Sequence, residues 1–387
     1  MLDVFWRFFL LGCTSFGGPA AHLGYFRKEF VERLRWCDEQ QYSQWVALSQ
    51  VMPGPGSSQV GFAIGVKRAG LLGGMAAFLG FTSPSVIVMI LLAALGSSFI
   101  AIPFVSSLIT ALKLLAIVVV LDAVISMARS FVSCIQTRSI AIVAFVFILV
   151  WPYGYSGIIL VAVAGVVGAF LKLEAPQTSF NLSSSRVLGL ASLALFVVLF
   201  LCSFILTDLS SDRLGAYLAN LYQAGALVFG GGHVVLPLVT DALSGIQSTD
   251  DILVGYAAAQ VVPGPMFTIA SYLGATAAPE GDVILWGILS SLAIFLPGLL
   301  LMLVGTYYWQ YWSAKKGLKK AVVAINASVV GLLAATLIDP IILTSVSHFY
   351  DAIVVCAVFM ASSRFKWAVW KLVLIFCAWA ALRMLLI

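Results

Sequence analysis

Glycine and proline residues that interrupt apolar stretches are the first candidates for chemistry in this sequence. Phe16-Gly17-Gly18-Pro19 lies near the start of the chain, and Pro53-Gly54-Pro55-Gly56 follows it. A helix does not continue through such segments, because proline lacks a backbone N–H and glycine leaves the backbone unconstrained. Each break therefore predicts the start of a short helix whose free N–H groups and positive dipole end favour an anion.

Side chains that can donate hydrogen bonds stand beside these breaks and beside similar breaks further along the chain. Hydroxyl and amide donors around one spot suit a tetrahedral oxyanion, because it accepts hydrogen bonds from many directions. His233 stands where the first glycine motif has its proline. The donor side chains are Gln50, Ser57, Ser58 and Gln59 in the first half and His233, Gln260 and Thr268 in the second.

The second half of the chain repeats the motifs of the first half in the same order and at nearly constant spacing. This predicts an internal duplication, with a first repeat at 1–173, a polar linker at 174–186 and a second repeat at 187–387. The matched pairs are Phe16–Pro19 with Phe229–His233, Gln50–Pro55 with Gln260–Pro265, and Leu79–Pro84 with Leu292–Pro297.

The charges of matching loops differ between the halves. Loops rich in lysine and arginine stay in the cytoplasm, so the loss of these residues places the second set outside. The halves are then inverted, a plan found in many membrane transporters. The basic residues of the first half are Arg27, Lys28, Arg33, Arg35, Lys67 and Arg68, and the matching loops of the second half carry Asp241, Asp250, Asp251, Glu280 and Asp282.

The composition places most of the chain in a lipid bilayer. Of the 387 residues, 62% are hydrophobic and 10% are charged, which leaves too little polar surface for a soluble protein of this size. We expect an all-α polytopic membrane protein, with re-entrant hairpins at 41–66 and 252–274 because each arm is too short to cross the bilayer. The expected full spans are 70–98, 105–127, 187–207, 283–309, 320–339, 344–362 and 367–386, with two short spans in 139–171.

Ionisable residues within the apolar stretches are few. Charge inside a membrane is costly and is often functional, so Lys113 and Asp122, with Arg27 and Lys28 of the first basic loop, are candidates for a charged pathway. Lys113 can also extend to one face of the membrane, and Asp122 and Asp339 lie near predicted helix ends. The scattered cysteines and histidines favour no metal site.

The same glycines and prolines have a simpler interpretation, in which they only kink helices or allow close helix packing. Their pairing at matching positions favours a functional role for the set. No Ser/His/Asp set, HExxH motif or nucleotide-binding P-loop is present in the sequence, so we expect no catalytic residues, no cofactor and no nucleic-acid partner.

Several of these segments together resemble one family. FGGPAAH at 16–22, YFRKEFV at 25–31, MPGPGSSQ at 52–59 and, in the second half, FGGGHVVLP at 229–237 and VPGP at 262–265 are similar to the chromate ion transporter family, in its long, two-domain form. The resemblance covers nearly the whole chain. One departure is Gly56, where many members have Thr or Ser, and the missing hydroxyl bears on substrate preference.

The resemblance implies a multi-pass protein of the bacterial inner membrane that exports chromate, confers chromate resistance and meets sulfate as a competitor. It also implies antiport driven by the proton gradient. A homodimer is a further expectation. Matching positions place in the functional core Gly17, Gly18, Pro53, Gly54, Pro55, Ser57, Ser58, Gln59, Gly230, Gly231, Gly232, His233, Pro263, Gly264 and Pro265.

Three alternatives to chromate export remain open at this point. The cargo can be sulfate or another oxyanion, moved in either direction. The protein can be a passive anion channel, which needs no gradient. A membrane-embedded enzyme is the weakest alternative, because the residues for catalysis are missing.

Overall fold

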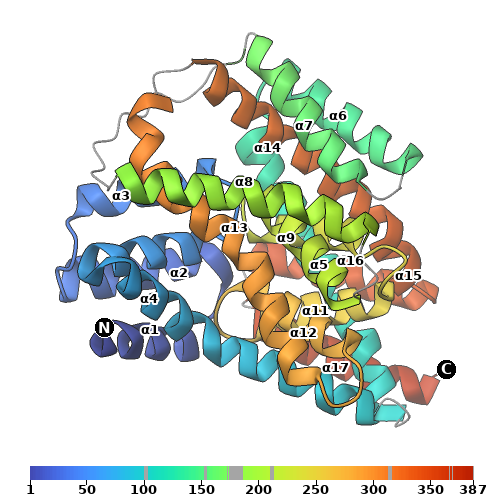
Figure 1. The fold of residues 1–387 in the computed structure, drawn as a ribbon. Coiled ribbons are helices and arrows are strands. Elements are labelled where there is room, and N and C mark those ends of the chain that lie inside the picture. The colour runs from blue at the N-terminus through green and yellow to red at the C-terminus, as the bar shows by residue number, and fades with distance from the viewer. Residues whose placement is uncertain are drawn as a thin grey trace.

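The computed structural model describes residues 1–99, 103–151, 155–171, 173, 186–209, 213–312, 316–365, 367 and 369–386. Every regular element in these ranges is a helix (Figure 1), which confirms the predicted all-α class. The α-helices are α1 (Leu2–Thr14), α2 (Gly18–Phe26), α3 (Glu39–Val51), α4 (Gly56–Phe99), α5 (Pro103–Phe131), α6 (Ile135–Val150), α7 (Ser156–Phe170), α8 (Arg186–Leu209), α9 (Arg213–Leu227), α10 (Val235–Ala242), α11 (Thr249–Val261), α12 (Ile269–Ala277), α13 (Val283–Trp312), α14 (Lys316–Thr336), α15 (Leu343–Ser345), α16 (Phe349–Phe365) and α17 (Val369–Leu386). Shorter turns of π- or 3₁₀-helix are η1 (Arg27–Arg33), η2 (Gly232–Val234), η3 (Met266–Thr268) and η4 (Leu337–Ile342).

Five helical segments of the described chain are long and apolar enough to cross a membrane: Gly56–Gly96, Ser107–Phe131, Arg186–Thr207, Val283–Tyr308 and Gly317–Ser345. The most apolar 18-residue window is 72% buried in the segment of α13 but only 17% buried in that of α8. Because α8 is apolar and exposed, its surface faces lipid. Helix α13 instead packs against α4, α8, α9 and α12 and forms part of the core (Figure 1).

Each predicted break separates two helices. Helix α1 ends at Thr14 before α2, α3 ends at Val51 before α4, α9 ends at Leu227 before η2 and α10, and α11 ends at Val261 before η3 and α12. Left-handed backbone at Gly17 (φ 101°), Gly54 (φ 125°), Gly230 (φ 79°) and Gly264 (φ 103°) makes the turns possible, and only glycine adopts these angles without strain.

The helices before the two Pro-Gly-Pro breaks begin in the same way. The Asp38 carboxylate accepts a hydrogen bond from the Gln41 backbone N–H at the start of α3 (2.7 Å), and the Ser248 hydroxyl accepts one from Asp251 N–H at the start of α11 (3.1 Å). Both residues are good N-caps, because their side-chain oxygens satisfy an otherwise free N–H group. Helices α3 and α11 each have 13 residues, so the two halves build this arm alike.

The structure matches one predicted helix limit and shifts another. Helix α4 is broken at Ala69 and Gly70, where the backbone is not helical, so the arm that follows the first Pro-Gly-Pro break ends close to the predicted residue 66. The span expected at 344–362 is α16 at 349–365 instead. The shift arises because Asp351 accepts a hydrogen bond from His348 N–H (3.1 Å) and holds the turn before α16.

Asp122 is not near a helix end, contrary to the sequence-based expectation. It lies well inside α5, which continues to Phe131. The predicted linker 174–186 falls outside the described residues except for Arg186, which already begins α8.

Candidate functional site

The four Gly/Pro breaks meet inside the protein. A Cβ atom built on Gly232 would lie 3.1 Å from Pro19 Cγ and 3.3 Å from Met266 Sδ. These three residues belong to the first glycine motif, the second glycine motif and the segment after the second Pro-Gly-Pro break. Segments far apart in the sequence therefore lie together inside the protein. This agrees with the prediction, because non-helical backbone at membrane depth must be buried in protein or line a cavity.

One backbone hydrogen bond joins each Pro-Gly-Pro break to the segment just before the glycine motif of the other half. Gly54 N–H donates to the carbonyl oxygen of Val228 (2.7 Å), and Gly264 N–H donates to that of Ser15 (3.0 Å). Val228 and Ser15 each stand two residues before the first glycine of their motif. The two bonds are thus the same contact, made once by each half on the other.

A second pair of contacts also crosses between the halves, and each joins a Pro-Gly-Pro segment to the residue that follows the third repeated motif of the other half. The Ser85 hydroxyl donates to Pro263 C=O (2.6 Å), and the Gln59 amide donates to Gly298 C=O (2.9 Å). Ser85 and Gly298 each follow the proline of the third repeated motif. The Gly54 and Gly264 backbones pack directly against Gly298 and Ser85, so each break is packed against the other half.

Outside the Pro-Gly-Pro breaks, which are 210 positions apart, equivalent residues in these contacts are separated by one interval. Val228 follows Ser15 by 213 positions, Gly230 follows Gly17 by 213, and Gly298 follows Ser85 by 213. Close helix approaches share the interval: added Cβ atoms on Gly12 and Gly225 would meet the carbonyl oxygens of Phe81 and Ile294. The pseudo-equivalence of the halves therefore extends from motif to packing.

Several predicted anion donors already have partners inside the protein. The N–H groups of Gly54 and Gly264 hold the opposite half. The Gln59 amide also donates to Pro53 C=O (2.9 Å), and the Thr268 hydroxyl donates to Pro265 C=O (2.8 Å). Ser57 Oγ lies 3.3 Å from Nδ1 of the fully buried His22. These groups hold the breaks in shape.

Other predicted residues line a cavity of about 190 Å³, which we call the glycine cavity. It brings together Gly17 and Gly18 from the first half and His233 and Gln260 from the second, with Asp122 of α5. The rest of its wall is formed by Val118, Val119, Ser362, Trp367, Val369 and Leu372. Both halves thus contribute to one small cavity with a polar edge.

Two groups on the wall of the glycine cavity can bind an anion, the N-terminus of α2 and the side-chain amide of Gln260. Helix α2 begins at Gly18 and no side chain caps its N-terminus, so the positive end of the helix dipole is directed at the cavity. Gln260 Nε2 is buried and makes no hydrogen bond of good geometry, although the Tyr256 hydroxyl is its neighbour. A buried donor that lacks a well-aligned partner is unfavourable unless a ligand satisfies it. His233 Nδ1 is 3.1 Å from Tyr256 Oη, which fixes the ring.

The remaining predicted residues lie outside the glycine cavity. Gln50 is exposed, whereas Ser58 is buried and its hydroxyl has no partner. The remainder form or flank the turns without lining the cavity: Pro53, Pro55, Gly230, Gly231, Gly232, Pro263 and Pro265.

The candidate pathway charges lie in different places. Lys113, which is 12% exposed, pairs with Asp250 at the start of α11 (2.6 Å), so its charge is balanced within the protein. Arg27 pairs with Glu32 and Glu39 (both 2.9 Å), and the Glu39 carboxylate raises the pKa of Arg27. Only Asp122 of this group lines the glycine cavity.

Sequence reasoning missed three residues that touch the breaks. Ser85 and Gly298 could have been identified from the sequence, because each follows the proline of the third repeated motif. Asn326 of α14, whose amide oxygen would lie 3.4 Å from a Cβ on Gly230, belongs to no motif. Nothing in the sequence pattern indicated it.

Comparison with known proteins identifies a family that matches both halves of the chain. The family model described as "Chromate transporter" matches residues 2–169 and again residues 215–382. The two matches begin 213 positions apart, the interval that separates the reciprocal contacts. Helix α8 lies outside both matched segments.

Two relatives cover most of the chain. A chromate transport protein of Pseudomonas aeruginosa is 28% identical over 343 residues, which are 87% of this chain and 80% of the relative. An uncharacterized transporter of Methanocaldococcus jannaschii is 26% identical over 348 residues, which are 87% of this chain and 83% of the relative. No solved structure matches the chain. The chain therefore belongs to the chromate transporter family, whose members are transporters and not enzymes, and is a multi-pass protein of the bacterial plasma membrane.

Proposed function

We propose that this protein exports chromate from the cytoplasm, with the dianion bound in the glycine cavity, and so confers chromate resistance. Membership of the chromate transporter family supports the cargo. The observation that carries the site is the meeting, at one cavity, of the uncapped α2 N-terminus and the Gln260 amide, which lacks a well-aligned partner.

The two halves act in this proposal as inverted repeats, at 1–173 and 187–387, around that cavity. The reciprocal hydrogen bonds of Gly54 and Gly264 support an origin by duplication, and the basic and acidic loops support opposite orientation. Alternating access then comes from rocking of one repeat against the other about a fixed site. Each Pro-Gly-Pro turn is a pivot, because it is anchored to the partner half.

Export is coupled to the proton gradient in this proposal. Asp122 and His233 are the titratable side chains on the wall of the glycine cavity, so they are the groups that can carry a proton beside the anion. Replacing Asp122 by Asn keeps the size of the side chain and removes its titration. We expect Asp122→Asn to retain exchange of labelled for unlabelled chromate and to lose accumulation driven by a pH gradient.

Transport into everted membrane vesicles tests the cargo and the site together. Energised vesicles should accumulate labelled chromate, and excess sulfate should reduce the uptake by competing for the same donors. Replacing Gln260 by Leu should weaken uptake by about tenfold, since it removes a buried donor worth roughly 1.5 kcal/mol to a charged ligand.

The exposed Gln50 at the matching position of the first half provides the control, and Gln50→Leu should leave uptake unchanged. Failure of wild-type vesicles to accumulate chromate would contradict the proposed cargo. Equal uptake by the Gln260→Leu and wild-type proteins would contradict the proposed site.

A further inference from the structure

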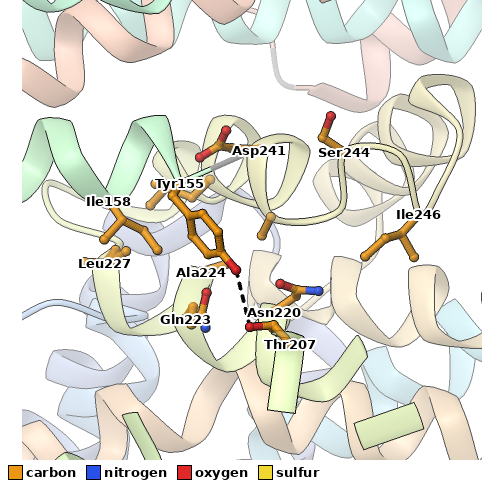
Figure 2. Close-up of a pocket in the computed structure, with 12 residues that line it drawn as sticks. Tyr155, Ile158, Thr207, Asn220, Gln223, Ala224, Leu227, Asp241, Ser244 and Ile246 are labelled. Carbon is orange, nitrogen blue, oxygen red and sulfur yellow. Dashed lines mark hydrogen bonds between the residues drawn. The ribbon is translucent and has the colours of Figure 1, made fainter. Parts of the chain in front are cut away.

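Two further cavities lie at the far ends of the short helices that leave the glycine motifs. The first, of about 440 Å³, is lined by Leu11, Tyr25, Lys28, Glu29, Glu32 and Arg33, and we call it the basic-loop cavity. The second, of about 240 Å³, lies between α7, α8, α9 and α10 (Figure 2), and we call it the Asp241 cavity.

Five of the six residues that line the basic-loop cavity have an equivalent in the wall of the Asp241 cavity. Leu11, Tyr25, Lys28, Glu29 and Arg33 of the basic-loop cavity are followed, 213 positions later, by five residues of the other wall: Ala224, Leu238, Asp241, Ala242 and Ile246. The interval is the one that relates the reciprocal contacts of the breaks. The two cavities therefore share one equivalent wall, contributed once by each half, and α7 and α8 complete the second cavity.

The charge at the equivalent position is reversed. In the basic-loop cavity, Glu29 and Glu32 pair with arginines, and none of the described residues forms an ion pair with Lys28. In the Asp241 cavity the polar wall residues Thr207, Asn220, Gln223 and Ser244 are neutral. Asp241 is its carboxylate, and Tyr155 is the other titratable side chain on the wall (Figure 2).

Asp241 is held in place by two hydrogen bonds. Gly157 N–H donates to Oδ2 (3.0 Å) and the Ser156 hydroxyl donates to Oδ1 (3.2 Å), both from the start of α7. No described cation pairs with the carboxylate. Burial raises the pKa of Asp241, whereas the bonds from Gly157 and Ser156 stabilise its charged form, and the ionised carboxylate acts on whatever enters the cavity.

We propose that the Asp241 cavity is the outer mouth of the transport path and that the Asp241 carboxylate repels dianions arriving from outside. The inference rests on the proposed export of an oxyanion and on the inverted halves. With the unpaired Lys28 ammonium at the inner mouth and a carboxylate at the outer mouth, binding from the cytoplasm is favoured over binding from outside. The positive charge at the inner mouth raises the local concentration of dianions, and the negative charge at the outer mouth lowers it. The same central site therefore fills more readily from the cytoplasm, which favours export.

Saturation curves of labelled chromate flux, measured separately from each side of the membrane, test this inference. Right-side-out vesicles present the outer face and everted vesicles present the cytoplasmic face. Asp241→Asn keeps an acceptor for Gly157 and removes the charge. At low ionic strength it should lower the half-saturating concentration in right-side-out vesicles about fivefold, as expected for one charge roughly 8 Å from a dianion in water. Everted vesicles should show no change.

Salt and two further variants separate charge from structure. In right-side-out vesicles at high salt, the half-saturating chromate concentration should be the same for Asp241→Asn and the wild-type protein, because the Debye length falls to about 3 Å. Lys28→Gln should have the converse effect, raising the half-saturating concentration only in everted vesicles. Glu280→Gln, an exposed acidic residue that does not line the Asp241 cavity, should alter neither side.

The outcomes are distinct. An unchanged half-saturating concentration for Asp241→Asn in right-side-out vesicles overturns the inference. Loss of flux from both sides also overturns it, because that result assigns Asp241 only to holding α7. If wild-type protein shows no saturable chromate flux from either side, the proposed function itself is wrong, and the inference falls with it.

Discussion

At the scale of single residues, the two Pro-Gly-Pro glycines combine a left-handed backbone with contact against the other half. Replacing Gly54 or Gly264 by Ala should destabilise the protein by about 2–4 kcal/mol, because left-handed strain adds to a steric clash. The added Cβ would lie 2.6 Å from Gly298 Cα in the first case and would meet Ser85 Oγ in the second. The midpoint of thermal unfolding in detergent measures the effect.

Gly281 separates the two causes. It also has a positive φ (95°), but a Cβ there meets no atom within 4 Å, so Gly281→Ala should cost only the backbone strain of about 1–2 kcal/mol. An equal loss for Gly281→Ala and Gly264→Ala would show that contact between the halves contributes nothing at the second break.

The two glutamines near the breaks should respond differently to the same substitution. Gln59→Leu loses two hydrogen bonds, to Pro53 and Gly298, and should lower the free energy of unfolding by about 1–3 kcal/mol. Gln260→Leu loses no bond of good geometry from Nε2, and should weaken chromate binding while leaving the unfolding midpoint nearly unchanged. Unfolding curves and equilibrium binding of labelled chromate to both variants decide this. The opposite pattern would exchange the roles of the two side chains.

Residue types and spacing went far in identifying these positions. The Gly/Pro motifs predicted all four breaks, because both residues act on the local backbone. The hydrogen-bond partners could not be predicted, since which half supplies the acceptor depends on tertiary contacts. Gln59 thus looks like an anion donor in the sequence and is occupied by Gly298 in the structure.

At the scale of helices, a buried ion pair joins α16 to α17. Asp351 is fully buried and lies 3.7 Å from Arg383 Nη2, and it also accepts a hydrogen bond from Trp379 Nε1 (3.0 Å). Arg383 lies within the predicted span 367–386, and this contact gives its charge a partner inside the protein. The pairing could not be read from the sequence, because the two residues are 32 positions apart on different helices.

Arg383→Met should therefore lower the free energy of unfolding by about 2–3 kcal/mol, since it leaves a buried carboxylate without its cation. Arg364→Met, at an exposed position of α16, should change the free energy by less than about 0.5 kcal/mol. Thermal unfolding of the two variants makes the comparison. Equal stability of both would mean that Trp379 and the backbone alone satisfy Asp351.

At the scale of the whole molecule, inversion of the halves predicts that the basic loops of the first half and the acidic loops of the second half lie on opposite sides of the membrane. In a variant without its native cysteines, Arg35→Cys should react with an impermeant thiol reagent only in everted vesicles, and Glu280→Cys only in right-side-out vesicles. Arg35 and Glu280 are both exposed, so access is decided by sidedness. Reaction of both cysteines from the same side would contradict inversion.

The all-α class and most helix positions followed from apolar stretches and breaks, because the bilayer leaves few options for the backbone. The hydrogen bonds between the two halves could not be predicted from the apolar stretches and breaks. Gly54 is bonded to Val228, and Gly264 is bonded to Ser15, which requires three-dimensional contacts that a linear repeat does not specify.

One dianion bound between the halves is the central claim, and equilibrium dialysis of labelled chromate against the purified protein tests it most directly. The account predicts one chromate per chain, with binding lost when either wall of the glycine cavity is changed. Gly18→Ala alters the first-half wall. An added Cβ has room there, because its nearest neighbour is Met266 Sδ at 4.0 Å, but the left-handed backbone (φ 75°) adds strain of about 1–2 kcal/mol, so the unfolding midpoint of the variant is measured beside its binding. Gln260→Leu alters the second-half wall. Two independent sites per chain, or loss of binding in only one of these variants, would contradict it.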